Sequence, residues 1–184
     1  NGDNIINKYD MVFMQSNTPE IIYGFGFSAI WKGIDFSVFF QGLGHCNTFL
    51  PEDITPFYYA NERGNILQHV ADNVFIPADI SGNPETENYN ALYPRMAQSN
   101  DRNNTVRSSY WLRSTAFLRL KNAEIGYTFP QILTKKLFVS KARIYLSGTN
   151  LLTFDSFDLW DPEVSGYGTY PLNMVGTIGI KLDF

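Results

Sequence analysis

The first ten residues place oxygen-bearing groups at a spacing that suits a hard cation. Asn1, Asp3 and Asp10 fall at positions three, five and twelve of a calcium loop of the D-x-N-x-D type, with the Ile5 carbonyl at position seven. Asn4 stands where glycine is usual, and asparagine tolerates the left-handed conformation that this position needs. The sequence therefore predicts a possible Ca²⁺ site, with a solvated turn as the alternative. No other cofactor is expected.

Aromatic residues far from any regular pattern form a second group of candidates. Aromatic faces can stack on sugar rings, because they offer apolar surface beside hydrogen-bonding tips. Packing within a long loop is the alternative at each of these positions. The predicted substrate-binding residues are Phe57, Tyr58, Tyr59, Tyr89, Tyr93 and Trp111.

Other reactive residues do not form a catalytic or metal-binding pattern. His45, Cys46 and His69 supply too few ligands at a credible spacing for zinc. Asp158, Asp161 and Glu163 could suggest the paired carboxylates of a glycosidase, but surface loops carry acids routinely and no second motif supports catalysis. The net charge of -4 comes without a basic patch, which argues against nucleic acid as a partner. The sequence predicts a protein that is not an enzyme.

Extended strands are the elements that must position these residues. Alternation with period two recurs in segments of about 10 to 14 residues, the length that a tilted membrane strand requires. A tight hairpin turn is expected at Lys32-Gly33, and a β-bulge near Lys121-Asn122 would reconcile the two halves of one segment. The predicted strands are Ile21–Lys32, Ile34–Gly42, Thr115–Phe129, Ala142–Leu152 and Pro171–Phe184.

The two faces of these strands differ in a way that favours a membrane protein. In the first strand Tyr23, Phe25 and Phe27 share one face, opposite Gly24, Gly26 and other small or polar residues. Aromatic residues make up 16% of the chain and charged residues only 17%, below the roughly 25% usual in soluble domains. No apolar run approaches the roughly 18 residues of a membrane helix. A soluble, secreted β-sandwich that binds carbohydrate is the alternative, but its strands are usually shorter and its interior is not polar.

The predicted fold is therefore all-β: the C-terminal portion of an antiparallel transmembrane β-barrel in the bacterial outer membrane, contributing about five strands. About eight strands are the fewest that close such a barrel, so further strands are expected upstream. Residues 1–20 are predicted to be the remnant of an extracellular loop, and residues 21–184 the C-terminal strands.

The lengths of the connections predict the orientation of these strands. Outer-membrane barrels have short periplasmic turns and long extracellular loops. Short connections at 32–33 and 130–140 alternate with long ones at 43–112 and 153–170, which places the long ones outside the cell. The same parity sends the last strand down to end in the periplasm.

The last eight residues resemble the C-terminal signal by which outer-membrane barrels are recognised for insertion. Its residues here are Thr177, Gly179, Leu182 and Phe184. We therefore expect Phe184 to be the true end of the protein, and Asn1 to be a point of truncation.

Several longer segments are similar to the SusC/RagA family of TonB-dependent outer-membrane transporters. They follow in the family's order and spacing, and the resemblance spans nearly the whole chain, being weakest in the loop 44–110 outside Asn90–Arg95. The segments are Trp31–Gly42, Phe117–Pro130, Arg143–Phe154 and Asp161–Val164.

This resemblance implies a barrel of about twenty-two strands, filled by a plug and energised through TonB from an N-terminal region outside this chain. It also implies a SusD-like surface lipoprotein as partner and outer-membrane lipid as surroundings. The imported nutrient would be an oligosaccharide or, in some members, a peptide. A passive porin or adhesin barrel is the remaining alternative.

Overall fold

The computed structural model describes residues 7–14, 18–51, 66–96, 106–135, 138–164, 166 and 168–184. The chain divides into two compact units, one made of residues 1–47 and 114–184 and the other of residues 48–113.

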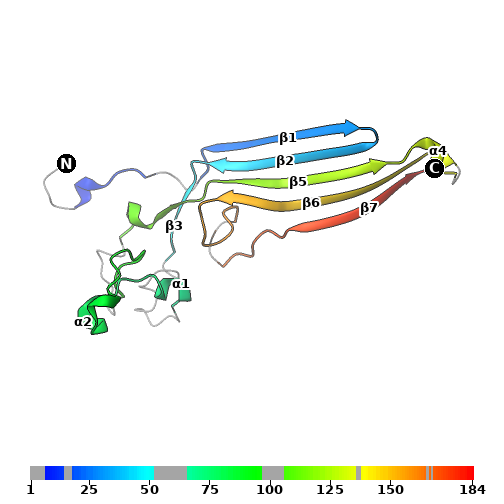
Figure 1. Cartoon of the computed structure of the whole chain (residues 1–184). Coiled ribbons are helices and arrows are strands. Elements are labelled where there is room, and N and C mark those ends of the chain that lie inside the picture. Colours follow the sequence, from blue (N-terminus) through cyan, green and yellow to red (C-terminus); the bar gives the residue numbers. More distant parts are fainter. Residues whose placement is uncertain are drawn as a thin grey trace. The chain divides into compact units, whose positions relative to one another are not determined.

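The first unit is built on a five-stranded antiparallel sheet with the order β1-β2-β5-β6-β7 (Figure 1). Every neighbouring pair is antiparallel, as the predicted barrel requires. The 3₁₀ turn η1 (Lys8–Asp10) precedes the sheet, and the helix α4 (Gln131–Thr134) lies between β5 and β6. The strands are β1 (Ile21–Trp31), β2 (Ile34–Gly44), β5 (Phe117–Thr128), β6 (Lys141–Asp155) and β7 (Val175–Asp183).

These bounds confirm the five predicted strands and the all-β fold, with one correction. The last strand begins at Val175, whereas the sequence pattern suggested Pro171. Pro171 has no backbone N–H to donate, and the next residues bond side chains instead of a strand: Leu172 N–H donates to Asp161 at 3.2 Å and the Asn173 carbonyl accepts from Asn150 at 3.0 Å.

The turn between β1 and β2 has the geometry that a two-residue hairpin needs. Lys32 and Gly33 both have positive φ, 47° and 89°, which matches a primed turn joining two twisted strands. A Cβ on Gly33 would lie 2.8 Å from the carbonyl oxygen of Thr128. Glycine at position 33 therefore serves both the turn and the close approach of β5.

The predicted bulge lies in β5. Along the β2–β5 ladder Phe39 pairs with Asn122 and Phe40 with Leu120, so Lys121 is the extra residue. Because of this extra residue, Leu120 lies on the same face of the sheet as Ala123 and Ile125, although it is an even-numbered residue and they are odd-numbered. This register confirms the reason for which the bulge was predicted.

The second unit, residues 48–113, is made of short elements. They are most of β3 (Asn47–Phe49) and β4 (Leu112–Ser114), which pair with each other, and α1 (Gln68–Ala71), α2 (Ala78–Ser81), η4 (Pro84–Thr86) and η5 (Ser109–Trp111). Its buried side chains are Leu50, Val70, Val74, Tyr93 and Trp111. A bridge between Val74 and Tyr93 joins the helical part to the segment that follows it. The long loop thus has a small core of its own.

Among the residues that the structure describes, no helix is long and apolar enough to cross a membrane.

Candidate functional site

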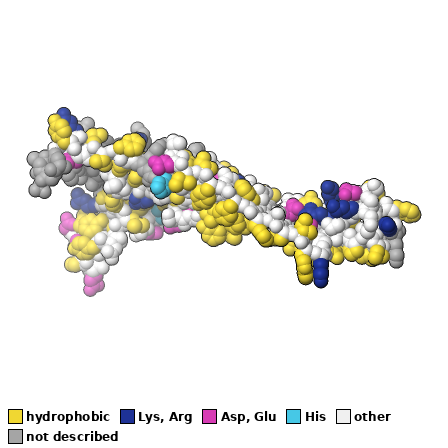
Figure 2. Space-filling model, turned by 90° about the horizontal axis from the view of Figure 1, so that it is seen from above, with side chains coloured by type: hydrophobic (Ala, Val, Ile, Leu, Met, Phe, Trp, Pro, Cys, Tyr) yellow, Lys and Arg dark blue, Asp and Glu magenta, His cyan; other side chains and the backbone are white. Residues whose placement is uncertain are grey.

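One face of the five-stranded sheet is apolar across every strand. The register aligns Phe27, Val38 and Ala123, and one step along it aligns Ile125, Leu146 and Ile178 in the same way. These side chains are largely open to the surroundings, Ile178 being 75% exposed. Figure 2 shows hydrophobic side chains gathered along the middle of the strands, while Lys, Arg, Asp and Glu side chains gather toward one end. Soluble monomers rarely expose an apolar area that covers a whole sheet, whereas a surface in contact with lipid must.

The opposite face carries an ion-pair network that spans three strands. Arg143 on β6 reaches across β5 to Asp35 on β2, with Nε 3.0 Å from Oδ1 and a second, shorter bond from Nη2 to Oδ2. The same Nη2 lies 2.6 Å from an oxygen of Glu124 on β5. Gly126 lies beneath the guanidinium, in the space that a Cβ would occupy. The absence of a side chain at Gly126 is what allows the arginine to cross the strand.

A second cluster holds the connection between β6 and β7 against the polar face of β5. Arg119 Nη2 and Asp161 Oδ1 are 2.5 Å apart, and Lys121 Nζ lies 2.6 Å from Glu163 Oε1. Asp161 also accepts the backbone N–H groups of Glu163 and Leu172, at 3.0 and 3.2 Å. Two of the acids that could suggest a glycosidase pair in the sequence are therefore bound to cations of the sheet. We name Arg119, Lys121, Asp161 and Glu163 the loop clamp.

Burial and hydrogen bonding oppose each other at Asp161. Burial raises the pKa of its carboxyl group, but the hydrogen bond from Arg119 and the two backbone N–H donors outweigh it and hold the pKa below 3.8. Asp161 is therefore ionised at neutral pH, and its charge is matched by that of Arg119.

The residues of the predicted insertion signal lie on and after β7. A Cβ on Gly179 would collide with the ring of Tyr145 from the neighbouring strand β6, so this glycine provides the room in which the tyrosine packs. Gly176 on the same strand has open space at the corresponding position. Thr177, Leu182 and Phe184 are exposed at this edge strand. Their role in insertion stays a prediction.

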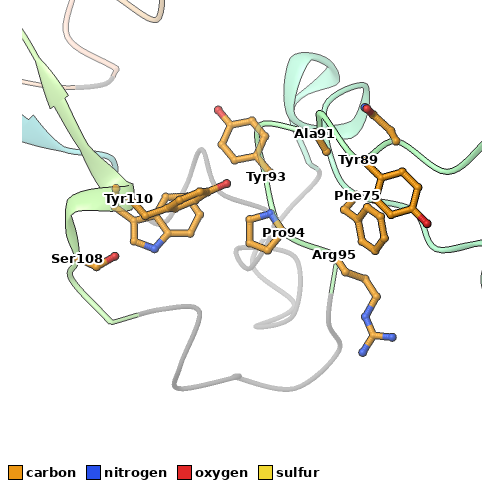
Figure 3. Close-up of a pocket in the computed structure, with 10 residues that line it drawn as sticks. Phe75, Tyr89, Ala91, Tyr93, Pro94, Arg95, Ser108 and Tyr110 are labelled. Atoms are coloured by element: carbon orange, nitrogen blue, oxygen red, sulfur yellow. The ribbon is translucent and has the colours of Figure 1, made fainter. Parts of the chain in front are cut away.

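A cavity of about 570 Å³ lies within the second unit (Figure 3). It collects three of the six aromatic residues predicted to bind substrate, Tyr89, Tyr93 and Trp111, while Phe57, Tyr58 and Tyr59 lie outside the described residues. The volume is within the range of about 300–1,000 Å³ that is typical of small-molecule sites. The remaining lining residues are Phe75, Asn88, Ala91, Pro94, Arg95, Ser108 and Tyr110.

The three collected aromatics do not contribute equally. Tyr93 and Trp111 are only 5% and 6% exposed, and their rings stack at 6.4 Å with 21° between the planes. They form the packed base of the cavity. Tyr89, 80% exposed, and Tyr110, 45% exposed, offer the accessible faces. Tyr110 was missed by the sequence reasoning, although its position next to Trp111 was a usable signal.

The hydroxyl groups in this cavity are held neutral. Burial raises the pKa of Tyr93 and of Tyr110 above 10.0. A hydrogen bond from the Tyr89 hydroxyl to a carboxylate oxygen of Glu87, 2.5 Å long, raises the pKa of Tyr89 as well. These groups therefore present uncharged hydroxyls at physiological pH.

The predicted calcium turn lies mostly outside the described residues, because Asn1, Asp3 and Ile5 are not among them. Asp10 is described, and its carboxylate accepts the backbone N–H of Asn7 at 2.8 Å in a capping box. Within the described part of the chain, no group of three or more His, Cys, Asp or Glu residues could hold a metal ion. The calcium site stays a prediction.

Comparisons with known proteins are consistent with this architecture. No family model matches the chain. TonB-dependent receptor P26 of Formosa agariphila is 31% identical over 198 residues, which cover 100% of this chain and 19% of the relative. TonB-dependent receptor P3 of the same organism is 25% identical, covering 100% of the chain and 18% of the relative.

Solved structures of the RagAB peptide importer resemble the chain in fold. The "open-open" state aligns with 92% of this chain and 18% of that chain, at a TM-score of 0.67 and 28% identity. The "closed-closed" state aligns with 94% and 18%, at a TM-score of 0.69 and 26% identity. The chain spans about a fifth of the length of the curated relatives that it matches.

Proposed function

We propose, given that this chain belongs to the SusC/RagA family of TonB-dependent receptors in the bacterial outer membrane, that it forms part of an importer for an oligosaccharide or peptide nutrient. The observation that carries the proposal is the contrast between the two faces of the sheet. The first is apolar and exposed along every strand, while the second carries the Arg143 network and the loop clamp. Such a wall suits lipid on one side and a polar passage on the other.

Each face has a separate task in this proposal. The apolar face anchors the wall in the hydrocarbon layer, where the antiparallel ladders satisfy the backbone polar groups that lipid cannot. The polar face borders the passage, and the network of Arg143, Asp35 and Glu124 ties three strands together there. The loop clamp holds the connection between β6 and β7 in a fixed position beside that passage.

The energy source and the partners belong to the same proposal. Membership in the TonB-dependent receptors supports coupling to TonB, and the likeness to the RagAB peptide importer supports a surface lipoprotein of the SusD type as partner. The connections 43–112 and 153–170 would face this partner outside the cell.

Uptake in intact cells tests the proposal. Cells with and without the receptor are given labelled oligosaccharides and labelled peptides, each with and without a protonophore that removes the proton-motive force. We expect receptor-dependent uptake of at least one class, abolished by the protonophore, and co-purification of a SusD-like lipoprotein with the receptor in detergent. Receptor-dependent uptake that resists the protonophore would indicate a passive pore instead, and uptake that does not need the receptor would refute the function.

A further inference from the structure

We infer that the cavity of the second unit is a recognition site for an acidic sugar, a pyranose ring that carries a carboxylate, within the oligosaccharide branch of the proposed function. The inference rests on that function and narrows it to one substrate class. Three features of the cavity carry it: accessible aromatic faces, neutral hydroxyl and amide groups around them, and one exposed guanidinium group.

The accessible rings of the cavity come from two sides. Figure 3 shows Tyr110 on one side of the cavity and Phe75 with Tyr89 on the other, with Tyr93 and Pro94 between them. Phe75 and Tyr89 lie 5.9 Å apart between ring centroids, and Tyr110 meets Trp111 edge to face at 4.8 Å. Because each ring is braced by a second one, the faces are presented in fixed orientations. Flat apolar faces of this kind pack against the C–H faces of a sugar ring.

Polar groups lie at the edges of these rings. Asn88 and Ser108 line the cavity, while the hydroxyls of Tyr89 and Tyr110 donate to Glu87 and to the carbonyl oxygen of Leu92 and keep only their capacity to accept. The amide of Asn88 and the hydroxyl of Ser108 can both donate to and accept from the hydroxyls of a sugar. The cavity thus pairs apolar faces with alcohol-binding edges, as a pyranose ring requires.

The charge of the cavity is a single cation. Arg95 is the charged residue among the described residues that line it, and it is exposed. No ion pair or hydrogen bond from its guanidinium to another described residue is present. Glu87 lies nearby, but its carboxylate already accepts the Ala78 N–H at 3.0 Å and the Tyr89 hydroxyl. A free guanidinium at the mouth of an aromatic cavity suits a carboxylate, which it can bind through two parallel hydrogen bonds.

The backbone around the cavity favours a sugar over a peptide. Peptides are often captured by pairing with an exposed strand edge. The segment that crosses this cavity uses its polar groups internally, because Tyr93 N–H donates to Asn73 O and Tyr93 O accepts from Phe75 N–H, both at 3.0 Å. Tyr93 therefore offers no free backbone edge to a peptide, and the side chains that line the cavity are rings, hydroxyl and amide groups and one cation.

Calorimetric titration of the intact receptor, purified from outer membranes in detergent, tests this inference. The probes are a tetramer of galacturonic acid, its fully methyl-esterified neutral form, and an acidic peptide that contains an aromatic residue. We expect the acid form to bind about 10-fold or more tightly than the ester, as a charge-assisted hydrogen bond predicts, and the preference to shrink as NaCl is raised.

Two pairs of variants locate the effect. Arg95→Gln is expected to remove the preference for the acid form, whereas Arg107→Gln, at an exposed arginine of the same unit that lies over Phe49, should leave it within about two-fold. Tyr89→Ala should weaken both sugar probes by about 5-fold or more through loss of a ring face, while Tyr89→Phe keeps the ring and the affinity. Tyr89 and Arg95 are exposed, so the four variants should fold as the parent does.

The outcomes separate this inference from the proposed function. Equal affinity for acid and ester, an acid preference that survives Arg95→Gln, tighter binding of the peptide, or no binding of any probe would each overturn the inference. Energised uptake of peptides or neutral sugars would leave the proposed function standing in all of those cases. Acid-specific binding without receptor-dependent uptake would instead refute the proposed function and keep the site.

Discussion

Removing Arg119 from the loop clamp should release the connection between β6 and β7 while the sheet stays folded. In the variant Arg119→Met the aliphatic stem is kept and the charge is lost. Asp161 would then lose its bond to Nη2 and keep only its two backbone donors, from Glu163 and Leu172. Glu163 would lose its longer ion pair with Arg119 Nε, at 3.4 Å, and keep its 2.6 Å bond to Lys121. The damage therefore falls mainly on Asp161.

The size of the effect follows from burial. The Arg119 side chain is 3% exposed and that of Asp161 is 10% exposed, so the pair is shielded from water. Removing one partner of a buried ion pair costs about 3–5 kcal/mol, because the other charge stays buried without compensation. Since backbone N–H groups continue to solvate Asp161, we expect the lower end, about 3 kcal/mol of local opening free energy, or about a 100-fold increase in the open population.

Hydrogen exchange on the purified receptor measures this change locally. The amides of Glu163 and Leu172 donate to Asp161, so they report directly on whether the clamp is closed. Their exchange rates should rise about 100-fold in Arg119→Met, whereas amides in the β1–β2 ladder should be unaffected. Arg107→Met, which removes an exposed arginine, is the matched control and should leave both amides unchanged.

Unchanged exchange of both amides in Arg119→Met, within about two-fold, would show that the clamp does not hold the connection. A second variant, Asp161→Asn, distinguishes lost charge pairing from lost shape. If the pair is what matters, Arg119→Met combined with Asp161→Asn should cost less than the sum of the two single changes.

Three further results are expected. Gly179→Val should sharply lower the yield of folded barrel, measured by heat-dependent mobility on gels, because the added side chain would displace the ring of Tyr145. Gly176→Val should be tolerated, because the space at its Cβ is open. Ile178→Arg on the apolar face should destabilise the barrel by up to about 2–4 kcal/mol in lipid-refolding titrations, whereas Thr177→Arg on the polar face should cost far less. The amides of Glu163 and Leu172 should stay protected as the pH falls toward 3.8, the ordinary pKa of an aspartate. Because the pKa of Asp161 is lowered in the folded state, its ionised form stabilises the clamp above that pH, and protection should be lost as the pH falls further. Loss of protection already near about pH 6 would contradict the ion pairing of Asp161.

The strands could be predicted because their signal is local. A face is set by alternation along a few residues, so Tyr23, Phe25 and Phe27 indicate the apolar face without reference to any partner strand. The bulge at Lys121 could also be predicted, since the parity of the apolar residues changes there. The turn at Lys32-Gly33 follows from two residues whose backbone conformations are restricted in a known way.

The candidate site was only partly accessible from the sequence. Tyr89, Tyr93 and Trp111 were identified by residue type, but which of them are buried depends on neighbours far along the chain. Arg95 was missed because an isolated arginine does not stand out by type or spacing, and Tyr110 was missed although it is an aromatic residue next to Trp111. Their importance comes from the cavity that the folded loop forms around them.

The sequence by itself determined the strands, the two unlike faces and the family resemblance, because alternation and motif spacing are properties of the chain. Only the tertiary structure decided what the charged residues do. Asp161 lies 42 residues from Arg119, and Arg143 lies 108 residues from Asp35, yet each pair is in contact. Register and bulges fix such pairings, so no local pattern could distinguish a structural ion pair from a catalytic one.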